Sequence, residues 1–116
     1  MKSLTTTELL NYVLLTDAMS GMHVISFMYQ DENNDSPLLQ VVEPFIIGDN
    51  AQTMVTELLG WSLLGDIEKS GNRLGWKSYA LEKIQDLDIT DRKFNRNRPE
   101  YDSSNHDMLF PLRAYV

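Results

Sequence analysis

The sequence of 116 residues contains no cysteine. This absence excludes disulfide bonds, thiolate nucleophiles and zinc–thiolate sites, and it is typical of proteins from a reducing compartment. Long apolar runs are missing too: the first residues do not form a signal peptide, and no stretch approaches the ~20 residues that span a membrane. We therefore expect a soluble, cytoplasmic protein with no membrane among its partners.

Positive charge is scarce in this chain. The 10 Lys and Arg residues stand against 17 Asp and Glu, which gives a net charge of −7. Residues 1–72 carry 2 bases and 10 acids, whereas residues 73–116 carry 8 bases and 7 acids. Because an acidic surface repels phosphate backbones, nucleic acid is not an expected partner. A basic run forms either a solvated loop or a local anion site, and both interpretations stay open. It consists of Arg92, Lys93, Arg96 and Arg98.

The residues that catalysis and cofactor binding need are also few. No glycine-rich phosphate loop or dinucleotide-binding pattern is present, and the two histidines are His23 and His106. His23 begins a predicted strand and is interpreted as structural. His106 lies among Asp, Ser and Asn residues that could offer metal ligands, but their spacing matches no recognised site. We therefore predict no catalytic residues, no metal site and no cofactor, and we do not expect an enzyme.

One amphipathic helix is predicted near the start of a single domain that comprises residues 1–116. Thr5 and Glu8 have the spacing of a capping box at a helix N-terminus. Gly21 predicts the end of the helix through a left-handed conformation, so the helix is expected over residues 6–20. Apolar residues recur at helical spacing within it and form one stripe. These residues are Leu9, Leu10, Val13 and Leu14.

Short strands are predicted after the helix. A polar cluster at residues 31–37 predicts a hairpin turn, Pro44 predicts a bend or a sheet edge, and Gly60 predicts a bulge or bend. The turn signal at residues 48–50 ends a short apolar run. The expected strands are residues 23–29, 38–43, 45–47, 54–64, 76–81 and 87–90, with a last one within residues 108–116. The predicted class is α+β and mainly β: the helix, a five- to six-stranded barrel over residues 23–94, and a C-terminal loop and last strand over residues 95–116.

The order of several short motifs resembles that of the WYL domain, a small Sm/SH3-like β-barrel of bacterial regulators and phage-defence proteins. The motifs are Val24–Tyr29, Val41–Phe45, Gly60–Gly65, Trp76–Ile84 and Leu87–Thr90. They cover roughly residues 8–94, and Phe94, Arg98–Tyr101 and Asp107–Met108 resemble short, free-standing relatives of that domain. The resemblance implies a module that senses nucleotides or single-stranded nucleic acid through basic residues on the barrel surface.

Three positions depart from the WYL pattern. Ser62 stands where the family has the tyrosine of its namesake tripeptide, Gln40 replaces a basic residue, and Ser78 replaces an arginine. The loss of these bases leaves the expected fold in place and argues against nucleic-acid binding through the family's usual surface. No helix-turn-helix pattern occurs, so we expect a free-standing module.

Five residues are candidates for ligand binding: Trp76, Lys77, Arg96, Arg98 and Tyr101. Arginine forks suit phosphate or carboxylate groups, and Tyr101 could hold a planar ligand beside them. Arg98 could instead pair with Glu100 or another acid. Trp76, like Trp61, could stack on a ring or belong to the core. Lys77 should point to the face of its strand opposite Trp76, as a surface charge.

Two functional hypotheses follow from the sequence. The first is a non-enzymatic ligand-binding or regulatory module that senses or sequesters a nucleotide or another small anionic ligand. The second is a protein–protein interaction or oligomeric assembly module without a small-molecule ligand. Open strand edges could join copies of the chain, and the acidic first part could bind a basic protein partner.

Overall fold

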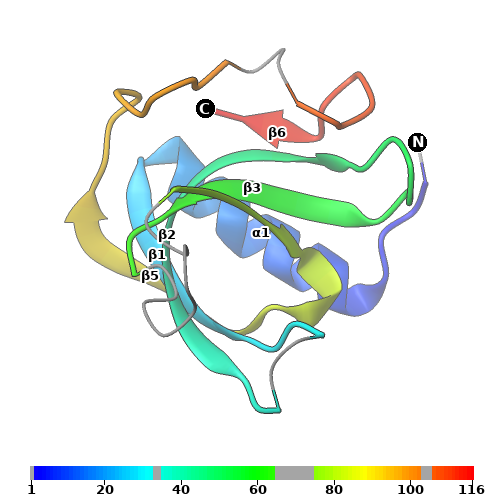
Figure 1. The fold of residues 1–116 in the computed structure, drawn as a ribbon, viewed down its shortest axis with the longest axis horizontal. Helices are drawn as coiled ribbons and strands as arrows, with labels where there is room; N and C mark the ends of the chain where they lie inside the picture. The colour runs from blue at the N-terminus through cyan, green and yellow to red at the C-terminus, as the bar shows by residue number, and fades with distance from the viewer. Residues whose placement is uncertain (1, 33–34, 65–74, 103–105) are drawn as a thin grey trace.

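The computed structural model describes residues 2–32, 35–64, 75–102 and 106–116, which form one helix and one antiparallel sheet (Figure 1). The elements are α1 (Thr6–Ser20), β1 (His23–Tyr29), β2 (Leu38–Asp49), β3 (Thr56–Ser62), β4 (Gly75–Ala80), the 3₁₀ turn η1 (Leu81–Lys83), β5 (Gln85–Lys93) and β6 (Ala114–Tyr115). The strand order is β4-β3-β2-β1-β5, and β6 pairs with β2. The predicted mainly-β class is confirmed.

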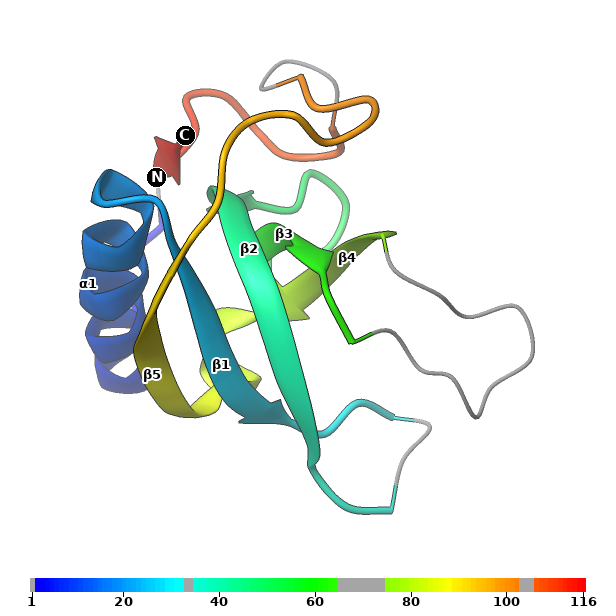
Figure 2. The same cartoon turned by 90° about the vertical axis from the view of Figure 1, so that its left-hand side faces the viewer.

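The sheet curls strongly but its strands do not form the closed barrel that the sequence predicts. Its hydrogen-bonded path ends at β4 and β5, and no pairing joins these two strands within the described residues. Instead η1 connects them, and α1 packs against η1, β1, β2 and β5. In Figure 2 α1 lies along the side of the sheet formed by β5 and β1.

β2 is longer than predicted because two expected strands join into one. Pro44 does not end the strand, but the register between β2 and β3 shifts between Pro44 and Ile46, as expected for a residue that cannot donate to the ladder. Gly60 lies opposite Pro44, where a Cβ atom would come within 2.4 Å of the Val42 side chain. The turn predicted at residues 48–50 is displaced, since Asp49 still belongs to the strand.

The predicted start of α1 is confirmed, whereas its end differs in detail. The Thr5 side chain accepts from the Glu8 amide, and the Glu8 carboxylate accepts from the Thr5 amide, as in a capping box. Gly21 is not left-handed, with φ −92°, and Met22 takes the positive φ of 55° instead. A Cβ atom on Gly21 would lie 2.7 Å from the His23 ring. Space beside His23, not backbone freedom, therefore requires a glycine at this position.

The buried face of α1 is not its apolar stripe. The helix turns five other side chains toward the sheet: Glu8, Asn11, Leu15, Ala18 and Met19. Asn11 is fixed there because its amide donates to the carbonyls of Leu81 and Ile84, at 2.8 and 3.0 Å. The predicted stripe faces outward instead, with Leu9 51% and Leu10 63% exposed. Polar contacts with η1 thus decide the orientation of the helix.

The sheet buries apolar side chains on both faces. On one face Leu15 and Met19 of α1 pack with Phe27, Leu58 and Tyr79 of the strands. On the other face the C-terminal segment, residues 94–116, covers a second cluster of apolar side chains. The buried members of that cluster are Val24, Phe45, Ile46, Phe94 and Met108. No helix of the described residues is long and apolar enough to cross a membrane.

Candidate functional site

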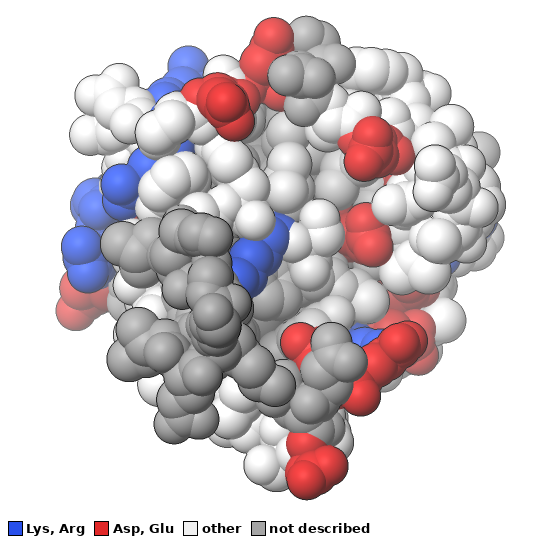
Figure 3. All heavy atoms as spheres, in the orientation of Figure 1, with Lys and Arg blue, Asp and Glu red and all other residues white. Residues whose placement is uncertain are grey.

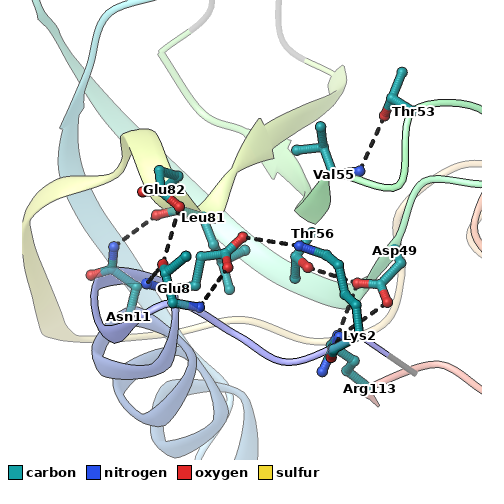
Figure 4. A network of polar contacts seen from close by, with 11 residues as sticks. Lys2, Glu8, Asn11, Asp49, Thr53, Val55, Thr56, Leu81, Glu82 and Arg113 are labelled. Carbon is teal, nitrogen blue, oxygen red and sulfur yellow. Dashed lines mark hydrogen bonds and ion pairs between the residues drawn. The ribbon is translucent and has the colours of Figure 1, made fainter.

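Two arginine–carboxylate pairs hold the C-terminal segment against β2. Arg98 donates two hydrogen bonds of 2.6 Å to the buried carboxylate of Glu43. Arg113 donates to both oxygens of Asp49, at 2.9 and 3.0 Å, and Thr56 donates to the same carboxylate at 2.7 Å (Figure 4). Each planar guanidinium group matches two carboxylate oxygens, so both pairs fix the direction as well as the position of the segment.

The pKa values of Asp49 and Arg98 reflect these pairs. Burial alone would raise the pKa of Asp49, but hydrogen bonds from Arg113 and Thr56 bring it below its ordinary value. The hydrogen bond to Glu43 raises the pKa of Arg98. Arg98 and Arg113, two of the three arginines of the C-terminal segment, are therefore both engaged in ion pairs with carboxylates of β2.

An aromatic cluster of Trp61, Trp76 and Tyr101 lies beside Arg98. The rings of Trp76 and Tyr101 stack with centroids 5.8 Å apart, and Trp61 meets Trp76 edge-on at 5.4 Å. The Trp76 indole donates to the Pro99 carbonyl at 2.7 Å, and the Tyr101 hydroxyl donates to the Val116 carbonyl at 2.6 Å. These bonds fix both rings in place and join β4 to the C-terminal segment.

A cavity of about 270 Å³ opens between this cluster and the C-terminal segment. Its volume lies near the lower end of the range for small-molecule sites. Trp76 and Tyr101 supply aromatic surface, and Leu59 and Met108 supply aliphatic and thioether surface. The charged groups at its lining are all carboxylates: Glu57, Glu100, Asp102 and Asp107.

The lining of the cavity favours a positively charged ligand. No Lys or Arg among the described residues lines it, and its polar side chains beyond the carboxylates are Asn50, Ser78, His106 and the Tyr101 hydroxyl. Burial raises the pKa of Tyr101, so this hydroxyl is neutral at physiological pH. Four carboxylates around a small, partly enclosed volume attract a cation, and aromatic rings add to that attraction.

No basic side chain of the described residues lines the cavity, but the positive charge of Arg96 is close enough to oppose the larger effect of burial on the pKa of the Tyr101 hydroxyl. In Figure 3 most of the visible Lys and Arg side chains gather along the left edge, where β5 ends in Figure 1, and Asp and Glu are scattered over the rest of that face. Within the part of the chain that the structure describes, no group of three His, Asp or Glu side chains could hold a metal ion.

The structure brings together two of the five residues predicted to bind a ligand. Trp76 and Tyr101 line the cavity, whereas Arg96, Arg98 and Lys77 do not. Arg98 pairs with Glu43, so the pairing that the sequence left open occurs, with a partner other than Glu100. Lys77 lies between two lining residues of β4, so its side chain points to the opposite face of the strand, as predicted.

Arg98 and His23 have structural contacts. The Arg98 guanidinium lies 5.0 Å from the centre of the Trp61 ring in addition to its pair with Glu43. The Nδ1 atom of His23 lies 2.7 Å from the Thr90 carbonyl oxygen, which ties β1 to β5. The structural role that the sequence suggested for His23 agrees with this contact.

Sequence reasoning missed Glu57 and Glu100 of the lining, and it considered Asp102 and Asp107 only as candidate metal ligands beside His106. Glu57, Leu59 and Trp61 alternate along β3, so the period of a strand could have placed Glu57 on the tryptophan face. Nothing local indicates that Asp107 returns to the same place from the C-terminal segment. The bridge between Asn50 and Met108 that brings it there joins residues far apart in the chain.

Comparisons with known proteins support the fold and no more. No family model and no curated protein matches the chain. The chain superposes on part of a solved protein and shares the fold of that part. That protein is proteasome accessory factor B/C (PafBC) of Arthrobacter aurescens, with a TM-score of 0.61 and 13% identity. The match covers 80% of this chain and 13% of that chain, so it relates this domain to a small part of a larger protein.

Proposed function

We propose that the protein is a non-enzymatic ligand-binding module with a regulatory role, and that its cavity takes a small ligand with a positively charged group. One observation carries the proposal: aromatic rings and four carboxylates line the cavity, and no described Lys or Arg does. A substituted amine or a quaternary ammonium group, attached to a small apolar or ring-shaped body, fits this chemistry.

The charge of the proposed ligand is opposite to the charge that the sequence suggested. The anion hypothesis depends on Arg96 and Arg98 as free bases beside Tyr101. Arg98 could meet a phosphate only by leaving Glu43, whose buried carboxylate would then lose its partner. A phosphate in the cavity would also lie among four carboxylates. The described contacts therefore support a cation better than a nucleotide.

A regulatory role follows from where the cavity lies. One of its walls is β3 and β4, and the other is the C-terminal segment with Glu100, Tyr101 and Asp107. A ligand that bridges both walls stabilises the segment on the sheet by the free energy of its binding. Occupancy could thus change which surface the segment offers to a partner.

Isothermal titration calorimetry with two probes of opposite charge tests the proposal. Benzyltrimethylammonium carries a ring and a cation, whereas adenosine monophosphate carries a ring and an anion. We expect the first to bind and the second not to bind. The variant that combines Glu57→Gln with Asp107→Asn should weaken binding at least about tenfold, a free-energy change of about 1.4 kcal/mol.

A matched control keeps the net charge of that variant. Asp88→Asn combined with Asp91→Asn removes two exposed carboxylates of β5 that do not line the cavity. This control should bind benzyltrimethylammonium as the wild type does. If both double variants lost the same amount of affinity for benzyltrimethylammonium, the loss would reflect only the net charge of the protein. If the wild type bound adenosine monophosphate more tightly than benzyltrimethylammonium, the proposal of a cationic ligand would be contradicted.

A further inference from the structure

The strand β4 forms an open edge of the sheet. It is the last strand of the hydrogen-bonded path, and within the described residues β3 is the strand that pairs with it. Figure 2 shows β4 at the end of the sheet farthest from α1. A row of unpaired amides and carbonyls at such an edge is a template on which a further strand can form.

The register of β4 identifies which main-chain groups point outward. In an antiparallel pair, every second residue turns its amide and its carbonyl away from the partner strand. The Ala80 amide donates to the Tyr29 hydroxyl at 2.9 Å and not to β3, so Ala80 belongs to the outward set. By the same alternation Ser78 and Trp76 belong to this set. Among the described residues, no backbone contact uses their amides and carbonyls at this edge.

The open edge of β4 adjoins the cavity. The side chains of Trp76 and Ser78 line the cavity, beside Glu57 and Leu59 of β3. Ser78 is also exposed, so solvent reaches this part of the strand. In an added antiparallel strand, the residue opposite Ser78 has its side chain on the same face of the sheet as the Ser78 side chain. That side chain therefore lies next to the aromatic and acidic lining.

We propose that an extended peptide segment with a lysine or arginine adds to β4 as an antiparallel strand and places its basic side chain in the cavity. This inference rests on the proposed function, because the cavity must accept the cationic group. Main-chain hydrogen bonds to Trp76 and Ser78 supply affinity that does not depend on the peptide sequence, and the cavity selects the residue opposite Ser78. The partner is thus a basic segment of another protein.

The charges favour a basic peptide over a second copy of the chain. With a net charge of −7, two copies repel each other. The base of β4 itself is Lys77, whose side chain points to the face opposite the cavity. If two copies of β4 paired around Ser78, the side chain brought to the cavity would be the serine of the second copy. A peptide with a base at this position matches the carboxylates of the lining, whereas a second copy does not.

Isothermal titration calorimetry with a capped seven-residue peptide tests the proposal. The sequence Thr-Val-Thr-Lys-Thr-Val-Thr places the lysine and both valines on one face of a strand. We expect this peptide to bind at least about tenfold more tightly than acetyl-lysine amide, which carries the same charge without the strand. A peptide with glutamate in place of the lysine should not bind, and equal binding of the two peptides would contradict the role of the cavity.

Two methylated peptides separate the contribution of the edge from that of the cavity. N-methylation of the lysine amide removes a hydrogen that faces β4, so it should weaken binding at least about tenfold. The matched control is N-methylation of the threonine before the lysine, whose amide points away from β4. This control should bind like the unmodified peptide.

Amide hydrogen exchange of the full chain locates the peptide. In the complex, exchange should slow at the amides of Trp76 and Ser78, because new hydrogen bonds protect them. The amides of Lys77 and Tyr79 face β3 and should be protected with and without the peptide. Benzyltrimethylammonium has no backbone and should not slow exchange at Trp76 and Ser78.

Three results would overturn this inference and leave the cation-binding cavity in place. The first is binding of benzyltrimethylammonium together with a peptide that binds no more tightly than acetyl-lysine amide. The second is equal affinity of the two methylated peptides. The third is slow exchange at Trp76 and Ser78 in the free protein, since another part of the chain or a second copy would then already cover the edge. If neither benzyltrimethylammonium nor the peptide binds, the proposed function fails as well.

Discussion

Arg98 is a structural residue according to its contacts, and its removal should lower stability. The Glu43 side chain is 4% exposed and would remain as a buried carboxylate without its guanidinium partner. Breaking a buried pair costs ~3–5 kcal/mol, and because the Arg98 side chain is 31% exposed we expect Arg98→Ala to lower the free energy of unfolding by about 2 kcal/mol. Urea denaturation measures this change.

Arg96→Ala is the matched control for that experiment, since Arg96 belongs to the same basic run but is exposed. It should change the free energy of unfolding by less than about 0.5 kcal/mol. Equal stability of the two variants would contradict the structural role of Arg98 and would return it to the candidates for anion binding.

Asp49 should make the protein sensitive to acid. Hydrogen bonds from Arg113 and Thr56 outweigh the effect of burial and lower its pKa in the folded state. A lowered pKa contributes stability that is fully present above the unfolded-state pKa of ~4 and is lost as the pH falls through the folded-state value. The free energy of unfolding of Asp49→Asn should therefore fall less steeply than that of the wild type as the pH is lowered below ~4.

The comparison with Asp49→Asn uses urea denaturation at several pH values. Its control is Asp91→Asn, at an exposed residue of β5, which should follow the wild type. If Asp49→Asn and the wild type lose stability in parallel as the pH falls, the pair with Arg113 does not hold the Asp49 carboxylate in its charged form.

From the sequence, an ion pair such as that of Arg98 could be predicted only as one of two alternatives, a free or a paired side chain. The sequence indicates that Arg98 is either free or paired, because acids are plentiful, but Glu43 lies 55 residues away. Which acid it meets depends on the path of the whole C-terminal segment. Thr5 and Glu8, by contrast, interact across three residues, and their capping box was predictable from local spacing alone.

At the scale of elements, β2 and β3 approach each other closely at Gly60. A Cβ atom there would lie 2.4 Å from the Val42 side chain and 2.7 Å from the Glu43 carbonyl oxygen. Gly60→Ala must therefore push the two strands apart, and we expect it to lower the free energy of unfolding by about 2 kcal/mol. Ser78→Ala on β4, at an exposed position, should have little effect. A Gly60→Ala protein as stable as the wild type would show that the strands can separate without cost.

Strand positions were predictable to within a few residues, and the orientation of α1 was not. Periodicity, Pro44 and Gly60 locate the strands and the irregular pairing between β2 and β3, because these signals act locally. The apolar stripe at Leu10 and Val13 suggested the wrong buried face. Asn11 is buried because its side chain donates hydrogen bonds to the carbonyl groups of Leu81 and Ile84. The sequence around Asn11 contains no pattern that predicts these distant contacts.

At the scale of the whole molecule, both faces of the sheet are apolar, so each face must be shielded from water by another part of the chain. The helix α1 provides one cover and the C-terminal segment provides the other. The class of the fold could be predicted from the order of helix and strands. The cavity could not, because half of its lining comes from the C-terminal segment, whose path depends on the pairs Arg98–Glu43 and Arg113–Asp49.

The most direct test of a cation-binding cavity is a titration of ¹⁵N-labelled protein with benzyltrimethylammonium, followed by two-dimensional NMR. If the cavity binds the cation, signals should shift at the Trp76 indole and in the amides of β3, β4 and residues 98–102 and 106–108. The same titration with adenosine monophosphate should leave these signals in place. No response to the cation at millimolar concentration, or shifts that cluster around Arg96 and the end of β5 on addition of the nucleotide, would contradict a cation-binding cavity.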